Sequence, residues 1–271
     1  MVKIPAIVIE IPEIDRSAPL IEILNKSSVF EIIKLPAVMY QFSKNEYRVD
    51  LEHLEIVYGR KMNEGEIGCA ISHLYAQEIL SKTNFGGIVL EDDARIPDLI
   101  KFEDLILRFF GNLESNEKSL LSLLPWQHRD PVQKTTLGYR SGIYKLTGST
   151  PLTVAYAVNA EAAKELSYAN KTIKYLPDWP KNDCTFYTSI DGVVNHGDGK
   201  TFSLIGERQF KKEFKLKLAI LTSIYFFQNR DHFNEYRNYF AAYFKPYFTW
   251  RIDNLKFKTI LLVNRFRIPK I

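Results

Sequence analysis

The stretch that decides the fold is Ile88-Val89-Leu90-Glu91-Asp92-Asp93-Ala94. Aliphatic residues follow the pair Gly86-Gly87 and end in three consecutive carboxylates, which is typical of a buried strand that stops at the acids. A buried strand does not tolerate three adjacent acids, so we expect them just past its carboxyl end. In an open α/β sheet, ligands bind at that edge.

These three carboxylates repel one another unless a cation or a basic side chain neutralises them. A hard divalent ion, Mn²⁺ or Mg²⁺, that also holds a diphosphate would meet this need. The alternative is an acidic loop in which Asp92 or Asp93 caps a helix expected over residues 96–110. The acids alone do not decide between the two.

The elements around this stretch favour an α/β fold with a mostly parallel sheet flanked by helices. We expect strands over residues 4–11, 29–35, 119–124 and 151–158, and helices over 19–27, 67–81 and 160–168, the last capped by Asn159. Residues 125–148 are expected to form a long loop over a site. Residues 176–199 contain two turn-rich segments.

The helix expected from residue 67 begins with small residues, Gly68, Cys69 and Ala70, that allow another backbone or a ligand to approach closely. Ser72 and His73 are adjacent and project about 100° apart, so we do not expect both to face the core. Two cysteines, Cys69 and Cys184, make neither a disulfide framework nor a zinc site. We expect both to be reduced packing residues.

Charge divides the 271-residue chain into an acidic body, residues 1–206, and a basic extension, residues 207–271. The extension has 14 basic and 5 acidic residues, a net charge of +9 against +4 overall, and holds 16 of the 36 aromatic residues. We expect helices there that either pack on the body or contact an anionic membrane; binding to nucleic acid is less favoured. No signal peptide and no membrane-spanning run is evident.

Three acids late in the body are candidates for a general base. Pro177 and Pro180 hold Asp178 beside Trp179 in a stiff turn, an arrangement suited to holding a sugar ring and accepting its proton. A surface turn explains the same residues equally well. Asp183 and Asp191 are the second choices, and His196 could complete a metal site, although a lone His in a loop is more often solvated.

Two motifs together resemble glycosyltransferase family 25: Gly65-Glu66-Ile67-Gly68-Cys69-Ala70-Ile71-Ser72-His73, followed by the strand that ends in Glu91-Asp92-Asp93. That family contains bacterial lipooligosaccharide galactosyltransferases. The segment Tyr156-Ala157-Val158 and the turn Pro177-Asp178 fit the same pattern, and the resemblance covers roughly residues 1–200. One departure is the turn after the first strand, usually Asn-Leu-Asp-Arg, which here reads Ile9-Glu10-Ile11-Pro12 with Arg16 further on.

The resemblance implies a GT-A-like, Rossmann-type fold and transfer from a nucleotide sugar with inversion. The strand-end acids would act as an Asp-x-Asp motif, with Asp93 the first candidate ligand of Mn²⁺ or Mg²⁺ and Glu91 and His196 its companions. Glu91 would also face the ribose or sugar of a UDP-sugar, supported by Asp92. Glu66, Ser72 and His73 are the further residues expected to bind the donor, and Asp178 is the expected base.

These observations predict a hexosyltransferase, with UDP-galactose the expected donor and a lipooligosaccharide or other surface glycan the acceptor, in the cytoplasm at the inner membrane. A metal-dependent nucleotidyl- or phosphotransferase is an alternative, but the chain has no Gly-x-x-x-x-Gly-Lys loop. A non-enzymatic basic protein that binds membranes or nucleic acid is the other.

Overall fold

The computed structural model describes residues 2–40, 48–58, 61–114, 116–125, 132–137, 142–146, 154–176, 183–190 and 192–197. Both the predicted extension over residues 207–271 and the turn that carries Asp178 lie outside these residues. In the described part of the chain, no helix is both long and apolar enough to span a membrane.

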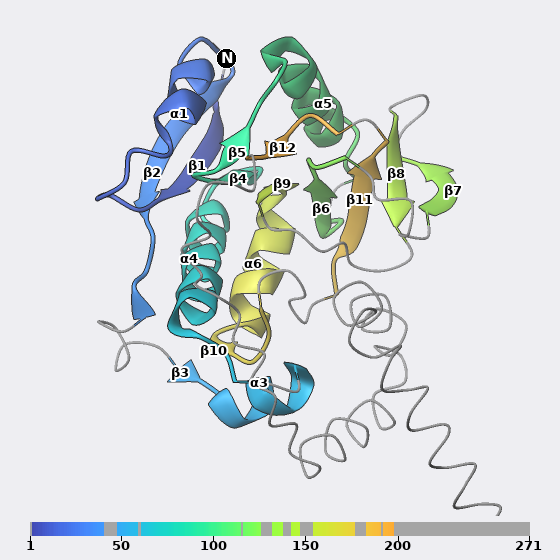
Figure 1. The fold of residues 1–271 in the computed structure, drawn as a ribbon. Coiled ribbons are helices and arrows are strands. Elements are labelled where there is room, and N and C mark those ends of the chain that lie inside the picture. Colours follow the sequence, from blue (N-terminus) through green and yellow to red (C-terminus); the bar gives the residue numbers. More distant parts are fainter. Residues whose placement is uncertain are drawn as a thin grey trace, which may run out of the picture. The chain divides into compact units, whose positions relative to one another are not determined.

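An eight-stranded sheet in the order β2-β1-β4-β9-β6-β11-β8-β7 forms the centre of the fold (Figure 1). β1 pairs in parallel with β2 and β4, and β6 with β11, whereas β9 runs antiparallel between β4 and β6. The strands are β1 (Ile4–Glu10), β2 (Phe30–Pro36), β4 (Gly87–Glu91), β6 (Ser119–Ser122), β7 (Val132–Thr136), β8 (Ile143–Leu146), β9 (Ala155–Val158) and β11 (Thr185–Ser189). The mostly parallel α/β sheet expected from the sequence is confirmed.

Helices cover both faces of this sheet. On one face α1 (Ala18–Leu24) and α5 (Leu99–Gly111) bury an aliphatic and aromatic core that includes Phe102 and Phe109. On the other, α4 (Glu64–Leu80) and α6 (Ala160–Ala169) pack on Ile7, Val89 and Val158. Period-two alternation along the strands produces the two cores, because successive side chains of β4 point to opposite faces.

Smaller elements extend the domain. β3 (Arg48–Val49) pairs in parallel with β10 (Thr172–Ile173), and α3 (Leu51–Tyr58) follows β3. β5 (Ala94–Arg95) pairs antiparallel with β12 (Asn195–His196) directly after the acids of β4. This pairing brings a distant part of the chain back to the end of β4.

One expectation from the sequence is wrong, and one alternative is excluded. Residues 125–148 are not one long loop, since they contain the antiparallel strands β7 and β8. β11 lies between the two turn-rich segments, in residues to which no element was assigned from the sequence, and it pairs in parallel with β6 and antiparallel with β8. The acids of β4 cap no helix: α5 begins after Asp98, whose carboxylate accepts from the Lys101 N–H at 3.1 Å.

Asn159 caps α6, as expected from the sequence, and also hydrogen-bonds the start of β6 and the residue Glu117 before it. Its Oδ1 accepts from the N–H of Ala162 at 2.9 Å and from that of Ser119, the first residue of β6, at 3.1 Å. Its Nδ2 donates to the Glu117 carbonyl. Just before β4, Gly86 (φ +96°) passes so close to this corner that a Cβ there would lie 2.1 Å from the Val158 carbonyl oxygen.

Replacing Asn159 by Ala should therefore lower the free energy of unfolding by about 2–4 kcal/mol, measured by urea denaturation. Loss of the cap contributes about 1 kcal/mol and the orphaned Ser119 N–H about 1–3 kcal/mol. Asp98→Ala is the matched control, since it removes only the exposed cap of α5 and should cost about 1 kcal/mol. Equal losses in the two variants would contradict the bridging role of Asn159.

Candidate active site

The three acids of the strand end separate onto different sides. Glu91 is the last residue of β4 and, by alternation, points with Val89 toward α4. Asp92 and Asp93 lie in the turn beyond the strand and face Arg16, which follows β1. Because β1 and β4 are parallel neighbours, their carboxyl ends and the residues beyond them meet at one edge of the sheet.

Arg16 pairs with both aspartates, and its single positive charge compensates one of their two negative charges. Its Nη2 lies 3.2 Å from Asp92 Oδ1 and 2.8 Å from Asp93 Oδ2, and all three side chains are at least 85% buried. The opposite oxygens, Asp92 Oδ2 and Asp93 Oδ1, are buried without a hydrogen-bond partner among the described residues. A buried carboxylate oxygen without a donor is costly, so these two atoms form a ready site for a cation with oxygen ligands.

Burial raises the pKa of Asp92 above its ordinary value of 3.8. The positive charge of Arg16 opposes this shift, and the negative charges of Asp93 and Glu91 add to it. The ionised form of Asp92 is therefore under-compensated by the protein's own residues. A bound cation would supply the missing compensation.

His196 reaches the same edge through the β5–β12 pair. Its Nε2 lies 3.6 Å from Asp93 Oδ2, and the N–H of the next residue, Gly197, donates to the Asp93 carbonyl at 2.9 Å. The structure thus brings His196 to Asp93, as a shared metal site requires. Glu91 does not join them in a three-residue ligand group among the described residues.

Glu91 instead ends a chain of hydrogen bonds across the α4 face. Its Oε1 lies 3.1 Å from His73 Nε2, and His73 Nδ1 lies 3.2 Å from the hydroxyl of Tyr156 on β9. Gln77 Nε2 donates to that hydroxyl at 3.4 Å. Burial raises the pKa of Tyr156, so its hydroxyl stays protonated and can donate a hydrogen bond to His73 Nδ1. His73 in turn donates to the carboxylate, which fixes Glu91 at the sheet edge.

Ser72 and His73 face different partners, as their spacing on the helix leads us to expect, and yet both are buried, since each is 1% exposed. A second partner explains this: the segment after β2 crosses α4 on its other side, where the Val38 N–H donates to Ser72 Oγ at 2.8 Å. A Cβ on Gly68 would lie 2.3 Å from the Val38 carbonyl oxygen, so this approach requires glycine. Ser72 therefore has a structural contact in this fold.

Glu66, also expected to bind the donor, takes part in the cap of α4. The Asn63 side chain accepts from the Glu66 N–H at 2.7 Å, and the Glu66 carboxylate accepts from the Asn63 N–H at 3.1 Å. This reciprocal pair is a capping box. Of the residues predicted from the helix motif, His73 is the one that contacts the strand-end acids.

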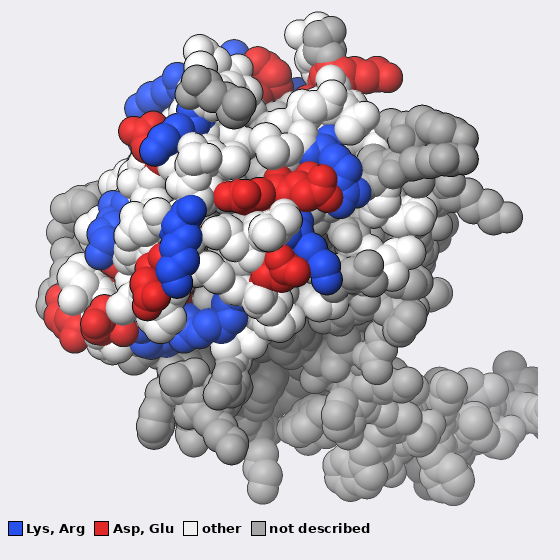
Figure 2. Space-filling model, turned by 90° about the horizontal axis from the view of Figure 1, so that it is seen from above, with Lys and Arg blue, Asp and Glu red and all other residues white. Residues whose placement is uncertain are grey.

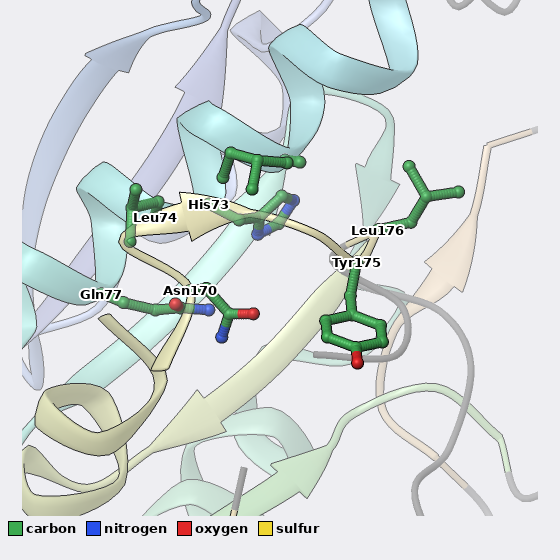
Figure 3. Close-up of a pocket in the computed structure, with 8 residues that line it drawn as sticks. His73, Leu74, Gln77, Asn170, Tyr175 and Leu176 are labelled. Carbon is green, nitrogen blue, oxygen red and sulfur yellow. The ribbon is translucent and has the colours of Figure 1, made fainter. Parts of the chain in front are cut away.

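A small pocket opens beside His73 (Figure 3). His73 and Gln77 line it from α4, Asn170 from the end of α6, and Tyr175 and Leu176 from the segment after β10. Leu176 is the last described residue before the turn that carries Asp178. The pocket therefore connects the Glu91–His73 pair with the segment that leads to the predicted base.

The remaining candidates for the base are Asp183, which the structure describes, and Asp178 and Asp191, which it does not. Asp183 is exposed and precedes β11, beside Lys118, which precedes β6. These strands run parallel to β4, so Asp183 lies at the opposite edge of the sheet, roughly 15 Å away at ~3.3 Å per residue of strand. The structure thus separates Asp183 from the strand-end acids. Asp191 and Asp178 lie outside the described residues, although Ile190 and Gly192 follow the carboxyl end of β11.

Three residues that contact the site in the structure were not predicted from the sequence as site residues. Arg16 was noted only as a departure from the family's turn, and Tyr156 and Gln77 were assigned no role. The family's arginine after the first strand was the available signal for Arg16; no signal in the sequence joined Tyr156 to His73. On the face shown in Figure 2, groups of acidic and basic side chains are interspersed over the described surface.

Comparison with known families settles the class of the protein. The family model of glycosyltransferase family 25, described as an LPS biosynthesis protein, matches residues 26–184, which is more than half of the chain. The chain belongs to this family. The match spans α4, the acids of β4, β9 and α6, and family membership implies a glycosyltransferase of lipopolysaccharide biosynthesis, with a sugar donor and a glycan acceptor. No curated protein matches the chain.

The raised pKa of Asp92 makes stability depend on pH. Below pH 3.8 the carboxyl is protonated in both states; as the pH rises, the unfolded chain ionises first and the folded state loses stability. We therefore expect the free energy of unfolding of Asp92→Asn, minus that of the native chain, to increase as the pH rises above 3.8. Both values are measured in urea without divalent ions.

The control Asp104→Asn removes an exposed carboxylate of α5 and its ion pair with Arg108, so it reports the effect of losing a surface charge with a surface ion pair. A difference between Asp92→Asn and the native chain that shrinks with rising pH would contradict the assignment.

Proposed function

We propose that this glycosyltransferase is a GT-A-like, inverting hexosyltransferase that moves a sugar from a UDP-sugar, with UDP-galactose the first candidate, onto a lipooligosaccharide or related surface glycan. The observation that carries the proposal is the pair of buried, unpartnered oxygens of Asp92 and Asp93 at the carboxyl edge of the sheet. The donor of such an enzyme brings a diphosphate, which needs a cation to hold it between acids.

The residues at this edge fit Mn²⁺ or Mg²⁺. Asp92 and Asp93 each offer a free carboxylate oxygen, hard ligands of the kind that these ions prefer, and His196 lies next to Asp93. When bound, the ion would neutralise charge that develops on the departing diphosphate. Arg16 holds the two aspartates in place and lowers their mutual repulsion, which limits the positive charge that an ion must add.

Glu91 would bind the sugar donor from the opposite side of the strand end, the side that faces α4. The chain from Gln77 through Tyr156 and His73 orients its carboxylate, leaving the side chain 22% exposed toward solvent at the edge. A fixed and partly exposed carboxylate is suited to accept hydrogen bonds from the hydroxyls of a ribose or sugar. We therefore assign Glu91 to the donor and the metal primarily to Asp93.

Inversion requires a base that takes the proton of the acceptor hydroxyl as its oxygen attacks the anomeric carbon and the bond to the diphosphate breaks. Asp178 is our first candidate, supported by its place in the sequence two residues after Leu176, which lines the His73 pocket. Asp191 is the second, since its described neighbours lie at the carboxyl edge. The basic, aromatic residues 207–271 would hold the enzyme at the cytoplasmic face of an anionic membrane, near a lipid-linked acceptor.

Asp93→Asn should reduce Mn²⁺-dependent transfer at least about 100-fold, because an amide is a weak ligand and the ion contributes several kcal/mol in the transition state. The assay measures transfer from a panel of UDP-sugars with and without Mn²⁺. Asp104→Asn is the matched control and should retain full activity. Unchanged turnover of Asp93→Asn would remove this residue from the metal site.

Asp178→Asn should retain donor binding and lose about 100-fold or more in transfer, because general base catalysis contributes roughly 10²–10⁴-fold. Binding of UDP with Mn²⁺ is measured by calorimetry, and transfer by product formation. The same two measurements on Asp191→Asn distinguish the candidates. Full transfer by Asp178→Asn together with loss in Asp191→Asn would move the base to Asp191.

A further inference from the structure

Cys69, His73 and Glu91 form a second group of metal-ligating side chains on the α4 face of the sheet. Their ligand atoms all lie within 4.8 Å of one another, and theirs is the one such group of three found among the described residues. Cys69 and His73 are four residues apart, so they project from the same side of α4. Glu91 meets them from the end of β4.

The distances between these atoms are close to those of a coordination sphere. His73 Nε2 lies 3.1 Å and Cys69 Sγ 3.9 Å from Glu91 Oε1. Around a tetrahedral Zn²⁺, with bonds of about 2.0 Å to N and O and 2.3 Å to S, ligand atoms lie about 3.3–3.6 Å apart. Movements of roughly half an ångström by His73 Nε2 and Cys69 Sγ would therefore place both atoms at coordination distance from one ion that also binds Glu91.

The surroundings of His73 resemble the outer shell of a metal site. Its Nδ1 contacts the Tyr156 hydroxyl at 3.2 Å, which holds the ring with Nε2 directed at Glu91. A metal-binding imidazole typically hydrogen-bonds a fixed polar group through its other nitrogen. Gln77, behind Tyr156, can accept or donate through its amide, so the network remains satisfied in either tautomer of His73.

We propose that Cys69, His73 and Glu91 bind a borderline-soft divalent transition ion, with Zn²⁺ the first candidate. The mixed S, N and O donors select Zn²⁺ over Mg²⁺ and Mn²⁺, which favour the oxygen ligands of Asp92 and Asp93. Three protein ligands leave one coordination position open. Binding releases the thiol proton of Cys69 to solvent. His73 remains a neutral imidazole that changes tautomer: Nε2 gives up its proton to coordinate the ion and Nδ1 gains one, so the ring releases no net proton.

This site differs from the one proposed for the donor diphosphate. The number of cysteines did not predict this site, because two cysteines alone cannot make a zinc site. His73, one turn after Cys69 on α4, and Glu91 at the end of β4 supply the other ligands. An ion there would join α4 to β4 at the residue that we assign to the donor. It would thereby fix the Glu91 carboxylate more firmly than the hydrogen bonds from His73 and Cys69 do.

The test is a titration of the full, metal-stripped chain with Co²⁺, a spectroscopic substitute for Zn²⁺. We expect a thiolate-to-cobalt charge-transfer band and intense visible bands of a low-coordinate ion, both lost on adding Zn²⁺ but retained in excess Mn²⁺. Cys69→Ser should lose the charge-transfer band. Cys184→Ser is the matched control and should keep it, because burial raises the pKa of Cys184 to about 12 and keeps that thiol protonated.

Absence of a charge-transfer band in the native chain, or its persistence in Cys69→Ser, would overturn the proposal and leave the group as a hydrogen-bonded cluster. Far-ultraviolet circular dichroism of the metal-free variants verifies their folding. If Cys69→Ser does not fold, alkylation of the native chain decides: Zn²⁺ but not Mn²⁺ should protect Cys69. Asp93→Asn separates the two proposals, since it should keep the cobalt spectrum while losing Mn²⁺-dependent transfer.

Discussion

Repulsion among three consecutive carboxylates at the end of a buried strand is the constraint on which this site depends. The fold relieves it by sending the acids to different partners. Strand alternation turns Glu91 toward His73 on α4, and the turn beyond β4 directs Asp92 and Asp93 toward Arg16. The relief is incomplete, because one oxygen of each aspartate remains buried without a donor among the described residues. These two oxygen atoms are the observation on which the proposed cation site rests.

Close packing of α4 makes this arrangement possible. The helix is held between the sheet and the segment after β2, where Gly68 admits the Val38 carbonyl and Ser72 bonds the Val38 N–H. With both sides covered, His73 has no access to solvent, and its hydrogen bonds must be made inside the protein. Tyr156 and Glu91 provide them. The motif of small residues followed by Ser-His is thus a packing motif that also positions His73 against Glu91.

Two chemically distinct environments result on the two sides of one strand end. Toward α1 lie hard oxygen atoms and an arginine; toward α4 lie a thiol, an imidazole and a carboxylate. A glycosyltransferase must hold a diphosphate and orient a sugar within a few ångströms of each other. Under the proposed assignment, separate side chains would serve the two tasks, although the negative charge of Glu91 still acts on Asp92 across the strand end.

The sequence by itself determined the α/β class, the strand that ends in the acids, the helix before it and the family, because these depend on local periodicity and on motifs contiguous in the chain. It missed β7, β8 and β11, whose existence depends on pairing with strands distant in sequence. Only the tertiary structure decided which acid meets which partner. Arg16, Tyr156 and His196 reach β4 from separate elements, and Asp183 is carried to the opposite edge by the direction of β11. Strand order and direction are non-local properties, so the acids and His73 could be predicted from contiguous motifs, whereas Arg16, Tyr156 and Gln77 and the geometry of the site could not.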